Sequence, residues 1–278
     1  MGKLDGKVAV VTGSSSGIGQ AVILAFAKEG AAVVLHGTNS ERIQKTNELL
    51  QNAGIGEDKI LVVQGLIQDE ATQNKIIDET IKKFGKLDIL VNNAAVSRKP
   101  DVEHSISVEN LDYLYEISYK SMFNLTEKAI PFLKETRGVI INTSSCSTNM
   151  TTIRPDLCAY AMIKTMTNMF TTYQAERLKE FGIRVNAVLP GPFETSLLYT
   201  KFKFPLSEEA QVEYDRYRKT VLSNIPVGQF GDFDGIAQVY LQMAVNPLVT
   251  NAQWLVDGGV SLVAKKNGNL HVWDEIQL

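Results

Sequence analysis

The sequence predicts an α/β fold in which helices cover both faces of a doubly wound parallel sheet. Short apolar runs recur along the chain, and stretches with the 3.6-residue spacing of amphipathic helices separate them. The runs lack polar alternation, as expected of strands that are buried on both faces. A glycine-rich segment directly follows the first run. Because no linker or internal repeat interrupts the chain, we expect a single domain over residues 1–278.

The apolar runs are expected to form the strands in chain order, at residues 8–11, 32–35, 60–63, 87–91, 139–141, 183–188 and 254–256. Helical spacing follows the first run, where Ile18, Val22 and Phe26 share one face. Further helices are expected at about 40–53 and, after the third apolar run, up to about residue 84.

Two segments depart from this alternation. Residues 196–225 are rich in aromatic and charged side chains and are predicted to form a lid over the substrate or, alternatively, a contact between subunits. Residues 261–278 continue past the last strand as a C-terminal extension.

Composition argues against several other classes of protein. The net charge is −3, from 28 basic and 31 acidic residues, and no run of like charges suggests a nucleic-acid or membrane surface. No stretch approaches the ~20 apolar residues of a membrane span. The N-terminus lacks an apolar signal core, and two cysteines are too few for a disulfide framework. The three histidines are scattered, so we expect a reduced cytoplasmic protein without a metal site.

The glycine-rich segment spans residues 12–19, between the first strand and the first helix. Glycine permits positive φ and close approach of the backbone to a phosphate, and the following helix N-terminus presents unpaired N–H groups. Its spacing, G-x-x-x-G-x-G, differs from the commoner dinucleotide fingerprint G-x-G-x-x-G. The segment predicts a pyrophosphate site rather than an ordinary tight turn.

Six motifs together resemble the short-chain dehydrogenase/reductase family. They occur in family order at residues 12–19, 92–95, 144–145, 160–164, 190–195 and 256–259. The resemblance runs from residue 7 to 259 and implies a Rossmann-type fold with a nicotinamide cofactor. It further implies a homo-oligomer, dimer or tetramer, that transfers hydride to or from a small-molecule carbonyl or alcohol.

Tyr160 and Lys164 are four residues apart, which places both on one helix face. A free tyrosine has a pKa near ~10, and a neighbouring ammonium is expected to lower it. The resemblance implies that Tyr160 is the proton donor and that Lys164 also binds the nicotinamide ribose. It assigns carbonyl polarisation to Ser145, at the end of a predicted strand, with Ser147 as a less favoured substitute.

Ser118 stands where the family commonly has an asparagine that supports a water chain to the lysine. A serine can hold a water, but it has a shorter reach and no amide. It can equally bond back to the preceding helical turn. Both roles for Ser118 remain open.

The resemblance also implies a set of cofactor contacts, with Thr195 at the carboxamide. Two of the positions depart from the family: Leu66 replaces a polar residue beside the adenine, and Ala95 replaces a glycine. The full set is Gly13, Ser15, Ser16, Gly17, Ile18, Gly19, Thr38, Leu66, Ile67, Asn93, Ala94, Ala95, Tyr160, Lys164, Pro190, Gly191, Phe193 and Thr195.

The end of the second predicted strand favours NADP, with NAD as the alternative. Gly37 occupies the place of the aspartate that would repel a 2′-phosphate. Ser16 and Thr38 stand where basic residues are expected, but both can donate hydrogen bonds to phosphate oxygens. Arg42 either reaches the phosphate or is an exposed helix residue.

Two other functions compete with the oxidoreductase. The first is a non-catalytic dinucleotide sensor on the same fold, for which Ser118 is the best argument. The second is a lyase or epimerase with a retained nicotinamide, against which the lack of a separate substrate domain argues.

Overall fold

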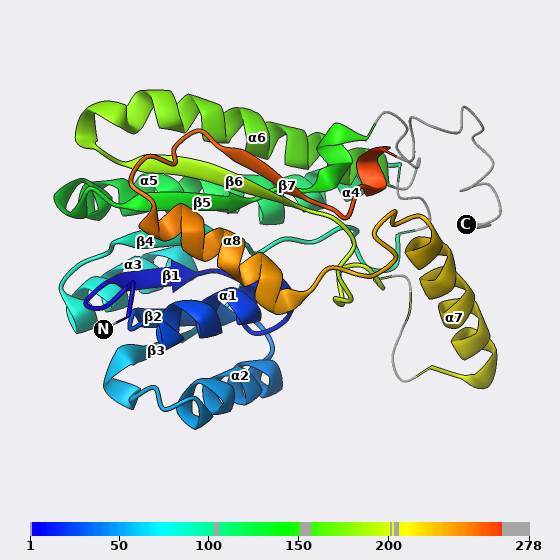
Figure 1. The fold of residues 1–278 in the computed structure, drawn as a ribbon, viewed down its shortest axis with the longest axis horizontal. Coiled ribbons are helices and arrows are strands. Elements are labelled where there is room, and N and C mark those ends of the chain that lie inside the picture. Colours follow the sequence, from blue (N-terminus) through cyan, green and yellow to red (C-terminus); the bar gives the residue numbers. More distant parts are fainter. Residues whose placement is uncertain (1, 103–105, 151–156, 201, 203–205, 263–278) are drawn as a thin grey trace.

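The computed structural model describes residues 2–102, 106–150, 157–200, 202 and 206–262. Its centre is a seven-stranded parallel sheet in the order β3-β2-β1-β4-β5-β6-β7, which confirms the predicted doubly wound fold (Figure 1). The order reverses between β1 and β4, which is where such sheets bind ligands. The strands are β1 (Val8–Val11), β2 (Ala32–Gly37), β3 (Ile60–Gln64), β4 (Ile89–Asn92), β5 (Val139–Thr143), β6 (Arg184–Pro190) and β7 (Gln253–Val256).

Helices cover both faces of this sheet. One face packs against α1, α2 and α8 around Phe26, Leu50 and Tyr240, and the other against α3, α5 and α6 around Ile76 and Leu125. The helices are α1 (Gly17–Lys28), α2 (Ser40–Asn52), α3 (Glu70–Phe84), α4 (Val108–Leu114), α5 (Ser121–Thr136), α6 (Cys158–Leu178), α7 (Glu208–Ser223) and α8 (Phe233–Val245). A π-helical segment (Tyr115–Lys120) joins α4 to α5, and short 3₁₀ turns span Glu57–Lys59, Cys146–Asn149 and Lys179–Phe181.

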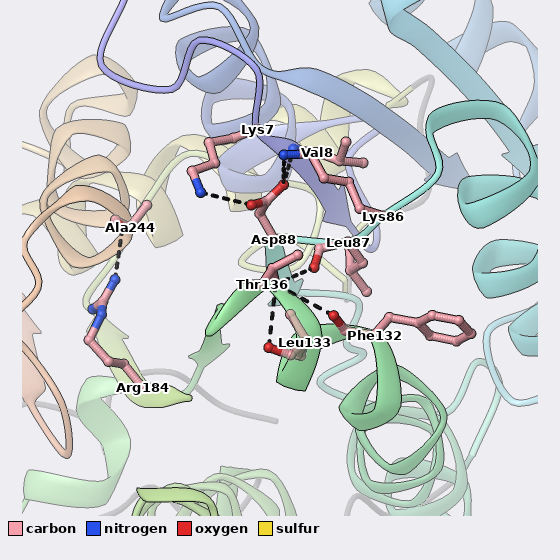
Figure 2. Close-up of polar contacts among 10 residues, drawn as sticks. All are labelled: Lys7, Val8, Lys86, Leu87, Asp88, Phe132, Leu133, Thr136, Arg184 and Ala244. Atoms are coloured by element: carbon pink, nitrogen blue, oxygen red, sulfur yellow. Dashed lines mark hydrogen bonds and ion pairs between the residues drawn. The ribbon is translucent and has the colours of Figure 1, made fainter. Parts of the chain in front are cut away.

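Charged side chains fasten the edge of the sheet where the strands begin. The carboxylate of Asp88 is 3% exposed; it accepts a hydrogen bond from the Val8 N–H at 3.0 Å and pairs with Lys7 at 2.8 Å (Figure 2). The strand β4 begins at Ile89, two residues later than predicted, although the Asp88 N–H already donates to the Val8 carbonyl at 3.0 Å. At the same edge, Arg184 donates to the Ala244 carbonyl at the end of α8. The opposite edge, where the strands end, remains available for a site.

The predicted lid segment contains α7, which stands away from the sheet (Figure 1). The ring of Tyr199 lies 4.8 Å from that of Tyr214 and 6.3 Å from that of Tyr217, measured between centroids. Glu194 accepts a hydrogen bond from Tyr199 and pairs with Arg218, which ties α7 to the loop after β6. These contacts give the segment its own small apolar cluster.

The predicted extension at residues 261–278 lies outside the described residues apart from its first two. Within the part of the chain that is described, no helix has the length and apolar character needed to cross a bilayer.

Candidate active site

A cavity of about 1270 Å³ opens where β1, β4, β5 and β6 end. It exceeds the ~300–1,000 Å³ of typical small-ligand sites, so it has room for a dinucleotide together with a substrate. All eighteen cofactor positions predicted from the sequence line it, as does Ser145. Ser118 is the one predicted site residue that is absent from the lining.

The glycine-rich turn forms one wall of the cavity. Gly13 and Gly17 have φ values of 62° and 58°, in the left-handed region that favours glycine. The Ser16 side chain does not cap α1, so the N–H groups of its first turn lack side-chain acceptors. A Cβ on Gly19 would lie 2.5 Å from the amide nitrogen of Asn93. The turn therefore offers a closely packed backbone surface that suits a pyrophosphate.

Asn93 fixes the glycine-rich turn to the end of β4. Its Nδ2 donates to the carbonyl of Thr12 at 2.9 Å and to that of Gly13 at 3.2 Å. In return, the Thr12 hydroxyl accepts from the N–H groups of Asn93 and Ala94, at 2.9 and 3.0 Å. The ends of β1 and β4 are thereby locked side by side at the base of the cavity.

Ser145 follows β5 and contacts the tyrosine. Its Oγ accepts the Ser147 N–H at 3.2 Å, and its hydroxyl lies near enough to the Tyr160 phenol to act on the pKa of that group. A serine whose oxygen is already an acceptor has its O–H proton left to donate. Burial raises the pKa of the Tyr160 phenol above its ordinary value of 10.0, although the Ser145 side chain acts in the opposite direction. Without a bound cofactor, Tyr160 is thus held protonated, contrary to the lowered pKa expected from its lysine neighbour.

Lys164 lies one turn beyond Tyr160 on α6 and is 3% exposed. Its Nζ donates to the Thr143 carbonyl at 2.7 Å and lies 5.6 Å from the centroid of the Tyr160 ring. Burial lowers the pKa of its ammonium to about 8. The predicted helix spacing thus brings the amine beside the phenol, and the end of β5 fixes its position.

Ser118 lies in the π-helical segment and is 3% exposed. Its Oγ accepts the N–H of Val96 at 3.1 Å and donates to the Val96 carbonyl at 3.4 Å. The bond back to the preceding helical turn, one of the two roles open for Ser118, is therefore not formed, because Ser118 bonds to Val96 in the loop after β4. The alternative role in a water relay gains no support from the cavity, whose lining excludes Ser118.

Several residues of the cavity were not singled out from the sequence. Directly after the motif at residues 92–95, Val96, Ser97 and Arg98 also line the cavity. The apolar members include Tyr113, Met150, Leu157, Leu197 and Val260. His36 also lines the cavity, although a single histidine within an apolar strand carries no sequence signal.

Comparison with known proteins agrees with this geometry. Residues 7–204 match the short chain dehydrogenase family. A 3-oxoacyl-acyl-carrier-protein reductase of Thermotoga maritima is 32% identical over 261 residues, covering 93% of this chain and 99% of that protein. The chloroplastic NADPH-dependent aldehyde reductase 1 of Arabidopsis thaliana is 33% identical over 249 residues, covering 88% and 81%.

A solved structure shows the same similarity in three dimensions. The 3-ketoacyl-(acyl-carrier-protein) reductase of Brucella melitensis, complexed with NADH, superposes with a TM-score of 0.79 at 30% identity. The superposition covers 93% of this chain and 99% of that one.

Proposed function

Because the chain belongs to the short-chain dehydrogenase/reductase family of oxidoreductases, we propose that it transfers a hydride between NADP(H) and a carbonyl or secondary alcohol. The observation that carries the proposal is the convergence of Ser145, Tyr160 and Lys164 on the cavity that the glycine-rich turn also lines. Membership of an enzyme family, together with this set of groups, favours an enzyme over the sensor. The catalytic domain comprises residues 1–278.

In the reductive direction, the glycine-rich turn and Asn93 would hold the reduced nicotinamide cofactor, which would supply the hydride for the carbonyl carbon. Tyr160 donates its phenolic proton to the carbonyl oxygen, and the former carbon–oxygen π pair forms the new O–H bond. The Ser145 hydroxyl donates a hydrogen bond to that oxygen as negative charge develops on it. The Lys164 ammonium binds the ribose hydroxyls and stabilises the tyrosinate that remains.

The preference for NADP is supported by the end of β2. A Cβ on Gly37 would lie 2.5 Å from the Oγ of Ser15, so an aspartate there would require this wall to shift. Around this position, Ser16 and Thr38 line the cavity with neutral hydrogen-bond donors, and Arg42 lines it with a cation. Asn39 caps α2 through the Arg42 N–H at 2.9 Å and is not part of the lining.

Oxidation of NADPH and NADH with a panel of ketones and aldehydes tests the cofactor assignment. We expect kcat/KM to be higher with NADPH, and Arg42→Ala to reduce that preference by about tenfold through loss of a charged partner of the phosphate. Arg42→Lys is the matched control, since it retains the charge. Equal or better use of NADH by the wild-type enzyme would contradict the NADP assignment while leaving hydride transfer in place.

The lid assignment is supported by the cavity lining, to which residues 197, 198, 200 and 217 contribute. We propose that this segment covers an apolar substrate and excludes water from the reacting carbonyl. The cytoplasmic location remains a prediction.

A homo-oligomer, dimer or tetramer, is supported by an exposed apolar stripe on α6. Met162, Met166, Met169 and Tyr173 are 51%, 36%, 71% and 60% exposed and follow helical spacing. A contiguous apolar face of this kind marks an interaction site. For the wild-type chain, light scattering should give a mass of two or four times the 30.7 kDa of one chain.

The double variant Met166→Glu/Met169→Glu should shift this mass toward the monomer, because it places charges in the interface. Val212→Glu, on exposed α7, is the control and should leave the mass unchanged. A monomeric wild-type chain would rule out the proposed assembly.

A further inference from the structure

His36 lies near the end of β2 and is 1% exposed. Its Nδ1 is 3.1 Å from the backbone nitrogen of Gly13, and its Nε2 is 3.2 Å from the carbonyl oxygen of Gly65. Because the Gly13 N–H can only donate, Nδ1 must be an acceptor, and the ring hydrogen must be on Nε2. The neutral imidazole therefore bridges the turn after β1 and the end of β3.

Backbone bonds complete this junction of three strand ends. The Ser14 N–H donates to the His36 carbonyl at 2.8 Å, and the His36 N–H donates to the Ser14 hydroxyl at 3.0 Å. The Gly65 N–H donates to the Gly37 carbonyl at 3.1 Å. Among the residues that the structure describes, the imidazole is the only side chain that hydrogen bonds to both Gly13 and Gly65.

Both glycines adjoin surfaces that the proposed cofactor would contact. Gly13 itself lines the cavity, and Leu66, which follows Gly65, lines it at the expected adenine position. Burial lowers the pKa of His36 to about 4, which keeps the ring neutral near pH 7. A protonated ring would turn a second N–H toward that of Gly13 and break the bridge.

We propose that His36 is a positioning residue for the dinucleotide: its ring fixes the spacing between Gly13 and Gly65, and thereby the two walls that hold the adenosine diphosphate half. This inference rests on the proposed function and adds to it a residue that no motif identifies. Without the bridge, the turn and the β3 end must be ordered during binding, and that cost reduces affinity.

The test compares wild type with His36→Phe, which keeps a ring but removes both hydrogen bonds. In calorimetric titrations with NADPH, NADH and 2′,5′-ADP, the Kd of His36→Phe should be about tenfold higher than the wild-type Kd for each ligand that the wild type binds. The KM for the dinucleotide should rise accordingly, while kcat at saturating dinucleotide stays within about threefold. His36→Asn, whose oxygen can replace Nδ1 as acceptor for Gly13, should recover most of the affinity.

Arg184→Met, at the opposite edge of the sheet, controls for a general loss of stability. If His36→Phe lowers the melting temperature as the control does yet binds dinucleotide like the wild type, the residue is merely structural and the inference is overturned. Should the phenylalanine variant not fold, His36→Met, which likewise makes neither hydrogen bond, replaces it with the same expectation. A wild type that prefers NADH contradicts the NADP assignment alone, whereas one that binds neither dinucleotide overturns both proposals.

Discussion

Replacement of Tyr160 by phenylalanine is expected to lower kcat by about 10²–10⁴-fold, the usual contribution of a positioned general acid. Tyr160 is 9% exposed, and burial raises the pKa of its phenol, which keeps it protonated at neutral pH. Phenylalanine preserves the ring that packs against Leu114, Ala159 and Ile163, and removes only the oxygen that carries the proton. Steady-state rates at saturating ketone and NADPH measure the loss.

Tyr113→Phe is the matched control, because it also removes a tyrosine hydroxyl from the cavity lining. We expect it to retain activity within about threefold, since no step of the mechanism uses that hydroxyl. Comparable losses in the two variants would show that the effect belongs to the cavity in general and not to proton transfer by Tyr160.

Lys164→Met is expected to produce the second large effect, a lower kcat combined with a higher KM for the dinucleotide. The methionine fills similar volume but loses the ammonium that lies beside the Tyr160 ring and donates to the Thr143 carbonyl. Loss of charge stabilisation in a buried site typically costs about 10²-fold in rate or more. Initial rates across a range of NADPH concentrations separate the two parameters. A change in kcat without any change in KM would contradict the assigned contact with the ribose.

The same variant isolates a pH-dependent contribution to stability. The folded pKa of Lys164 is about 8, against an ordinary value of 10.5, so between these pH values the unfolded chain binds more protons. Stability contributed by Lys164 therefore increases as the pH rises through this window and is lowest when the buried amine is charged. In urea unfolding without cofactor, the free energy of unfolding of the wild type minus that of Lys164→Met should increase by about 1 kcal/mol between pH 7 and pH 9. A constant difference would contradict the lowered pKa.

Local patterns in the sequence predict most of the framework. Buried parallel strands leave continuous apolar runs, and glycines at positive φ mark the turn after β1, so both are visible without tertiary information. The i, i+4 spacing likewise places Tyr160 and Lys164 on one face of α6.

Contacts between distant segments could not be predicted in this way. Ser118 meets Val96, and His36 meets Gly13 and Gly65, through pairs of elements that are adjacent only after folding. Burial after folding raises the pKa of Tyr160, whereas the spacing alone suggested that Lys164 would lower it. The burial of Asp88 just before β4 likewise depends on partners from another segment, the Val8 N–H and the Lys7 ammonium.

The central claim is that Tyr160 supplies the proton that accompanies hydride transfer. Single-turnover stopped-flow measures it most directly, with enzyme and NADPH premixed at concentrations above Kd and then combined with saturating ketone. We expect Tyr160→Phe to bind NADPH with a Kd within about threefold of the wild-type value, while the rate of NADPH oxidation in the first turnover falls at least about 100-fold. A first turnover as fast as that of the wild-type enzyme would contradict it.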